Sequence, residues 1–174
     1  MQPPTEPTGR LAAFGTQLID VHHSLREELS RLRDSVDAFL DGEDQRPREL
    51  RAHCLTFCSA LERHHTGEDR NAFPTLAEEF PELRPVLEKL QEDHYLVSDI
   101  LRRIEALVGD LDAELDEDEA DRVRRELDGL SAIVESHFSF EERQIVEALN
   151  SLNAPGWEGS KPDFLKMPGG AVPD

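Results

Sequence analysis

The fold is decided by the stretch LIDVHHSLREELSRLRDSVDAF, residues 18–39, because its apolar residues recur at helical spacing. Intervals of four and three residues alternate along it and place one set of side chains on a common face: Leu18, His22, Leu25, Leu29, Leu32, Val36 and Phe39. Such a seam is typical of a helix that packs against other helices. His22 occupies a seam position where leucine is expected, so the stretch predicts a bundle helix that turns an imidazole into the core.

The helical period continues through most of the chain, and no strand-like alternation lasts. The pattern predicts helices over residues 11–40, 47–70 and 81–111, and a fourth that begins within 116–119 and ends near residue 149. Gly42 supplies a helix stop and Pro81 a helix start, and residues 71–80 are expected to form a connection with at most one short helical turn. The sequence therefore predicts an all-α fold, an antiparallel up-down-up-down four-helix bundle.

The length of 174 residues is most simply that of one domain. We expect residues 11–149 to form the bundle and residues 1–10 to be a disordered N-terminal segment. Residues 150–174 are a Pro/Gly-rich tail, expected to be loop or disorder, and its apolar residues can anchor part of it on the bundle: Trp157, Phe164 and Leu165.

The chain is strongly acidic, with 19 basic and 38 acidic residues and a net charge of −19 at pH 7. Such a charge repels phosphate backbones and anionic membrane surfaces, so nucleic-acid and membrane partners are disfavoured. No apolar run is long enough to span a bilayer, and the N-terminus has no signal-peptide core. Cys54 and Cys58 lie four residues apart on one predicted helix, which is poor disulfide geometry, so a cytoplasmic location is expected.

Each of the other predicted helices also carries a histidine on its apolar seam: His64, His94 and His137. Glu68 and Glu141 follow two of them by four residues, which puts each pair on one helix face. Residues at equal height in an antiparallel helix pair are equidistant from the turn. The midpoints of successive histidines fall at residue 43, at residue 79 and between residues 115 and 116, all inside predicted connections. We therefore expect four histidines and two glutamates to converge in one layer of the core.

A single histidine on an apolar face is most often a hydrogen-bonded core residue, but that interpretation fits poorly for four imidazoles and two carboxylates at one height. Burying each ion costs several kcal/mol, and neighbouring buried carboxylates repel each other. Bound metal ions offset both penalties. Mixed imidazole and carboxylate ligands suit iron, manganese and also zinc, but structural zinc prefers a closed four-ligand site without bridges. The residues thus favour two iron ions, bridged by carboxylates and by an oxo or hydroxo group.

The segments that carry these residues are DVHHSLREEL, LERHHTGEDRNAFP, QEDHYLVSDIL and HFSFEER, at residues 20–29, 61–74, 91–101 and 137–143. Together they resemble the hemerythrin-like (HHE cation-binding) family, whose members are four-helix bundles with a non-haem di-iron centre. The resemblance covers roughly residues 11–149. It implies that His22 and His64 bind one iron and that His94 and His137 bind the other. It also implies that Glu68 and Glu141 bridge the two ions.

Two positions depart from the oxygen-carrying members of that family. Those proteins have a second histidine on the third helix where this chain has Ser98, and an aspartate five residues after the last histidine where this chain has Glu141 at four. The iron at His94 and His137 is therefore expected to lack its third nitrogen. His65, about a third of a turn from His64, is a candidate replacement, and a ligand role and a hydrogen-bonding role suit it equally. These departures weaken the expectation of reversible oxygen carriage.

The seam residues on either side of the polar layer are apolar, so the site is expected to be dry, to admit O2 or NO and to exclude bulky organic substrates. One hypothesis is a binding module that binds, stores or senses O2 or NO. A second is an enzyme, a peroxidase- or catalase-like or NO-consuming oxidoreductase, which the altered third-helix ligand favours. A third is a metal-free helical interaction protein. The ligand would then be O2, NO or H2O2, and the sequence identifies no reductant or signalling partner.

Overall fold

The computed structural model describes residues 13–43, 46–111 and 116–168. The expected N-terminal segment, residues 1–10, and the expected start of the first helix at Leu11 lie outside these ranges. The long helices are α1 Phe14–Leu40, α2 Pro47–Gly67, α4 Arg84–Gly109 and α5 Glu117–Ser151. The shorter elements are a π-helix Glu68–Ala72, α3 Phe73–Glu79, α6 Pro155–Gly159 and 3-10 turns Pro81–Leu83 and Asp163–Leu165.

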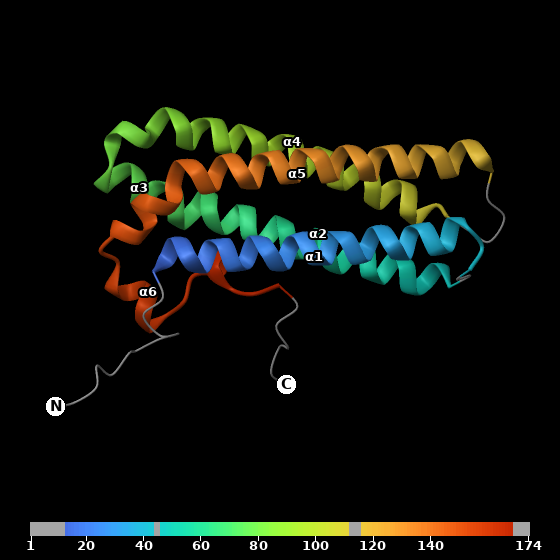
Figure 1. The fold of residues 1–174 in the computed structure, drawn as a ribbon, viewed down its shortest axis with the longest axis horizontal. Coiled ribbons are helices and arrows are strands. Elements are labelled where there is room, and N and C mark those ends of the chain that lie inside the picture. The colour runs from blue at the N-terminus through green and yellow to red at the C-terminus, as the bar shows by residue number, and fades with distance from the viewer. Residues whose placement is uncertain (1–12, 44–45, 112–115, 169–174) are drawn as a thin grey trace.

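The four long helices run alternately up and down and lie side by side (Figure 1). Helix α1 packs against α2 and α5, and α4 packs against the same two helices, so α1 and α4 are diagonal partners. This arrangement confirms the predicted all-α bundle, and the described residues contain no strand. Within the described ranges, every helix falls short of the length and apolar character that crossing a bilayer requires.

The hydrophobic core is divided into two parts by a polar layer. One apolar cluster fills the end near the α1–α2 turn and extends from Val21 and Leu25 to Phe39 and Val108. The other fills the opposite end, with Phe14, Leu18 and side chains from α3, α4, α5 and the C-terminal residues. The seam residues expected to flank the site are all buried: Leu18, Leu25, Phe57, Leu61, Leu90, Val97 and Val134.

The ends of α1 and α5 follow from their local sequences. Gly42 has φ 79°, the left-handed conformation that glycine adopts without a Cβ penalty. The N–H of Glu43 then donates to the carbonyl of Ala38 at 2.8 Å, which closes the helix end. At the start of α5 the Asp116 carboxylate accepts a hydrogen bond from the N–H of Asp118 at 2.7 Å, as expected for an acidic N-cap.

The second connection differs from the prediction. Residues 71–80 were expected to form a connection, yet the backbone stays helical as far as Glu79. A proline inside a regular α-helix clashes with the preceding turn, which is why Pro74 indicated a break. The π-helix immediately before it widens the hydrogen-bond ladder, so that the N–H of Phe73 bonds to the carbonyl of Glu68. Pro74 then falls in the first turn of α3, where proline is tolerated.

The C-terminal residues pack onto the bundle instead of forming an open loop. Residues 152–168, here called the C-terminal strap, include α6 and a 3-10 turn. Phe164 and Leu165 are buried against α1 and α2, and the Trp157 ring lies edge-on to Phe14 and Phe164 at centroid distances of 5.1 and 5.3 Å. The apolar residues of the strap therefore belong to the same core cluster as the ends of the bundle helices.

Two glycine substitutions should change stability in opposite directions. Gly42→Ala should lower the free energy of unfolding by about 1–2 kcal/mol, because alanine is strained at a positive φ. Gly129 lies within α5 with open space around its missing Cβ, so Gly129→Ala should raise it by about 0.5–1 kcal/mol. Urea denaturation measures both. Equal effects of the two substitutions would contradict the assigned helix end.

Candidate metal centre

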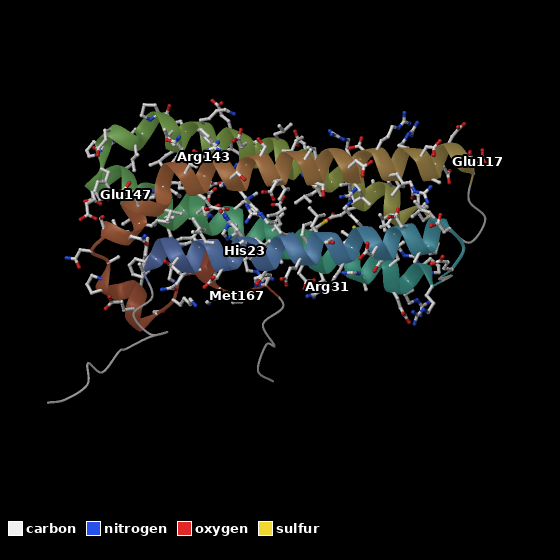
Figure 2. All side chains as sticks on the ribbon, viewed as in Figure 1. His23, Arg31, Glu117, Arg143, Glu147 and Met167 are labelled. Atoms are coloured by element: carbon white, nitrogen blue, oxygen red, sulfur yellow. The ribbon has the colours of Figure 1, made fainter. Side chains whose placement is uncertain are left out.

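The structure brings all seven candidate residues into the polar layer that separates the two apolar clusters. They come from four helices and the π-helix: His22 from α1, His64 and His65 from α2, Glu68 from the π-helix, His94 from α4, His137 and Glu141 from α5. Each is buried, and both glutamates have 0% exposure. The neighbouring His23 is exposed on the outside of α1 (Figure 2), so the seam pattern selected the inward member of this pair.

Their potential ligand atoms form two groups, each with all atoms within 4.8 Å of one another. The first group is His22, His64, Glu68 and Glu141, and the second is His65, Glu68, His94 and His137. Glu68 Oε1 lies 3.4 Å from His64 Nε2 and 3.3 Å from His94 Nε2, so this carboxylate faces both groups. Glu141 does the same, at 3.4 Å from His22 Nε2 and 3.0 Å from His137 Nε2. The arrangement has the donor composition of two cation sites joined by two carboxylates.

The inward-facing atoms lack hydrogen-bond partners within the described structure. They are Nε2 of His22, His64 and His65, and both carboxylate oxygens of Glu68 and Glu141. An unsatisfied buried polar atom costs about 1–3 kcal/mol, and folded proteins contain few of them. Here they gather in one place and point at one another. The donor set therefore fits bound cations, because a cation satisfies each of these lone pairs at once.

The outward-facing nitrogens of four imidazoles are held by acceptors. His22 Nδ1 lies 2.9 Å from Glu142, His94 Nδ1 2.8 Å from Asp69, and His137 Nδ1 3.3 Å from Asp93. His64 Nδ1 lies 2.8 Å from the carbonyl oxygen of Phe164 in the strap. Since carboxylates and carbonyls only accept, each Nδ1 must carry the proton. Each Nε2 then faces the site, which is the orientation that metal-binding histidines require. The Nε2 atoms of His94 and His137 lie 3.2 Å apart and share a hydrogen bond in the absence of a cation.

His65 joins the second donor group and Ser98 does not. The His65 ring stacks on His94 at a centroid distance of 3.9 Å and meets His137 edge-on at 5.2 Å. Ser98, the position that carries a histidine in oxygen-carrying hemerythrins, donates to Glu62 at 2.6 Å instead. Adjacent residues of a helix point about 100° apart. His64 and His65 can therefore serve the two groups from one turn of α2.

In the absence of a cation, the pKa values of the two glutamates shift in opposite directions. Burial raises the pKa of Glu68 well above its usual value, and the Glu141 carboxylate raises it further. Burial also acts to raise the pKa of Glu141, but its close contacts with the Glu68 carboxyl group and the surrounding imidazoles outweigh burial and hold that pKa well below its usual value. One carboxyl group thus keeps a proton that the other lacks. A cation between them removes the need for that proton.

The pKa values of two of the imidazoles, His64 and His94, also shift in opposite directions. Burial lowers the pKa of His64 to about 3, and repulsion from His22 contributes. Burial also disfavours protonated His94, but its hydrogen bond to Asp69 and the nearby Glu141 and Glu68 carboxyl groups raise its pKa to about 12. In the second group the acidic partner Asp69 therefore supplies negative charge that a bound cation would share.

Sequence reasoning missed the outer partners. Asp69 follows Glu68, Glu142 follows Glu141 and Asp93 precedes His94, so three of these carboxylates are sequence neighbours of candidate ligands. That adjacency was an available signal. The fourth acceptor, the Phe164 carbonyl, leaves no trace in the sequence because any residue supplies a carbonyl. The π-helix that carries Glu68 and Asp69 was also missed, and such turns often occur at functional sites.

Comparison with known proteins gives one match. A family model described as the hemerythrin HHE cation binding domain matches residues 15–149. No curated protein and no solved structure matches the chain significantly. The matched range begins and ends within α1 and α5 and includes all seven candidate residues.

Removing the partner of His94 should weaken metal binding. Asp69→Ala should lower the affinity for a divalent cation about 10- to 100-fold, because His94 loses the acceptor that orients it. Competition with a chromophoric chelator measures the affinity. The control Asp99→Ala removes an exposed aspartate of α4 that pairs only with Arg102 among the described residues. If both variants bind equally well, Asp69 does not orient a ligand.

Filling the space at Gly67 should displace the strap. A Cβ there would lie 2.9 Å from Phe164 N, closer than real Cβ atoms approach, and 3.1 Å from Phe164 Cβ, which is tighter than most Cβ contacts. Gly67→Ala should lower the free energy of unfolding by about 1–3 kcal/mol and speed amide hydrogen exchange in residues 160–168. Gly109→Ala, in α4 with open space around it, is the control and should leave exchange in the strap unchanged.

Proposed function

Because the chain belongs to the hemerythrin HHE cation-binding domain family, we propose that its seven buried donors hold a non-haem di-iron centre that binds O2 or NO. His22 and His64 would hold one ion, and His65, His94 and His137 the other. Glu68 and Glu141 would bridge them. The observation that carries this proposal is the convergence of unpartnered imidazole nitrogens and carboxylate oxygens in two groups that share Glu68.

The identity of the metal follows from the donor chemistry. Five imidazoles and two carboxylates form a mixed nitrogen and oxygen set with no thiolate, because Cys54 and Cys58 lie in the apolar cluster away from it. Such a set suits iron better than a structural zinc ion, which prefers four closed ligands. Bound iron would supply open ligand positions and redox chemistry for O2, NO or peroxide. A cytoplasmic location, consistent with the two free thiols, stays part of the proposal.

The two groups differ in nitrogen donors, which supports a position for a small ligand beside His64. The His22–His64 group has two imidazoles and the other group has three. A cavity of about 20 Å³ lies beside His64, under strap residues Asp163 and Met167. That space holds about one water-sized molecule. Its lining combines apolar side chains such as Val21 and Leu25 with the charged Arg63, Asp163 and Lys166, and its small volume excludes larger substrates.

An enzyme that consumes peroxide is the second candidate, and one observation favours it. His137 Nδ1 is bonded to Asp93, which is partly exposed and bonded in turn to Lys89 at the surface. This chain of polar groups can move a proton between solvent and an imidazole of the centre. A binding module does not need such a route, whereas peroxide reduction consumes protons.

Metal content tests the proposal directly. Protein from iron-supplemented cells should contain two iron ions per chain, show oxo-bridged ferric absorption bands that shift with azide, and unfold at lower temperature after chelation. At an ion concentration 100 times the dissociation constant, the loss is about 2.7 kcal/mol. Glu68→Gln should abolish two-ion binding, and the exposed Glu147→Gln on α5 (Figure 2) should not. Iron-free protein with unchanged melting after chelation would overturn the proposal.

The same preparation separates the two candidates. A binding module should form a stable spectral adduct with NO or O2 and return unchanged when the gas is removed. An enzyme should consume peroxide over many turnovers, and Asp93→Asn should slow that turnover while iron content stays at two per chain. Turnover that is unaffected by Asp93→Asn would show that Asp93 does not carry the proton, and protein that consumes no peroxide would contradict the enzyme.

A further inference from the structure

A groove of about 480 Å³ lies between α4 and α5 on the outer side of the polar layer. Its volume is within the range of small-molecule sites, about 300–1,000 Å³. From α4 it is lined by Lys89, Asp93 and Leu96, and from α5 by Ala132, Ile133, Ser136, His137, Phe140 and Arg143.

The groove reaches an imidazole of the metal centre from outside. His137 is one of its lining residues, and Asp93, which binds His137 Nδ1, is another. The cavity beside His64 also touches an imidazole but offers only about 20 Å³. A diatomic molecule fits that cavity, whereas an organic molecule fits the groove. The two spaces adjoin opposite donor groups, so they can be occupied together.

The lining combines apolar walls with cations. Leu96 is 49% exposed, and with Ile133 and Phe140 it offers an apolar surface to a ligand. Lys89 and Arg143 lie at the groove, and the single acidic residue of the lining, Asp93, is already bonded to Lys89 and His137. Arg143 projects from the outer side of α5 (Figure 2) and makes no ion pair or hydrogen bond with any described residue. Its charge is available to a ligand.

A second hollow on the same helix lacks this combination. It measures about 470 Å³, and the described residues that line it are all charged: Asp118, Asp121, Arg122, Arg124 and Arg125. Mixed charges without apolar walls favour water over an organic molecule. The comparison singles out the α4–α5 groove, because apolar contact and positive charge coincide there on a chain whose net charge is −19.

We propose that the α4–α5 groove binds a small organic anion, an aromatic or aliphatic body with one carboxylate or sulfonate group. The apolar body lies on Leu96, Ile133 and Phe140, and the anionic group pairs with Arg143, while Lys89 stays paired with Asp93. The ligand then lies against the outer edge of His137 without entering the metal centre. Its relevance to the centre rests on the proposed function, but the binding itself does not.

The probe is 8-anilinonaphthalene-1-sulfonate, with N-phenyl-1-naphthylamine as its uncharged counterpart. Both fluoresce when they bind an apolar surface. The metal-loaded protein should bind one sulfonate per chain, and Arg143→Gln should weaken that binding about tenfold while it weakens binding of the uncharged amine less than twofold. Ala132→Trp, at an exposed groove position, should block both probes. Higher salt should weaken sulfonate binding, because exposed charges are screened.

Matched controls keep the outcome clear. Arg125→Gln makes the same charge change on the same helix, in the hollow without apolar walls, and should leave sulfonate binding unchanged. Ala52→Trp places the same ring at an exposed position of α2, away from the groove, and should block neither probe. The proposal is overturned if Arg143→Gln and Ala132→Trp bind the sulfonate like the unaltered protein. Iron content is measured on the same samples, so a chain that lacks iron but binds the probe in the groove contradicts only the proposed function.

Discussion

The whole structure depends on the burial of two carboxylates between the apolar halves of one bundle. Glu68 and Glu141 are completely buried, face each other, and have no hydrogen-bond partner for their oxygens among the described residues. Left alone, such a pair is among the least favourable arrangements that a protein core can contain. Every other feature of the layer compensates for it. The imidazoles turn their lone pairs inward, and acceptors outside them fix the tautomers that make this possible.

The compensation is built from residues far apart in the sequence. Glu142 holds His22 from another helix, and Arg26 in turn bonds Glu142 at 2.9 Å. The His22 ring also stacks on Phe138 at a centroid distance of 3.9 Å. These contacts join α1 to α5 around one candidate ligand, His22. The contacts that orient His22 are therefore also contacts that pack α1 against α5, so a change to one affects the other.

The four helices and most of the polar layer were predictable from the sequence, because the helix seams indicate both where the helices lie and which side chains face inward. The recurrence that predicted four helices also placed His22, His64, His94 and His137 on their inner faces, and the midpoint argument put them at one height. The described helices and the buried layer agree with that expectation. The assignment of these residues as iron ligands remains a prediction, supported by the geometry.

Other parts were not predictable, for physical reasons. Pro74 indicates a break in a regular helix, and only a wider turn before it allows the backbone to continue, which a periodicity argument does not consider. His65 was left undecided because its direction depends on how α2 is rotated in the bundle. The contact of Phe164 with His64 depends on a backbone atom 100 residues away, and no side-chain pattern encodes it.

The C-terminal strap extends the structure around the candidate site beyond the residues that the family model matches. A protein cut at the last residue of the family match would keep every candidate ligand, yet His64 Nδ1 would lose the acceptor that it has among the described residues, and the apolar surface under Phe164 and Leu165 would be bare. In this chain the strap lies beyond the family match, yet its Phe164 carbonyl holds one of the imidazoles of the candidate site. The side chains that line the site are therefore only part of the structure that supports it.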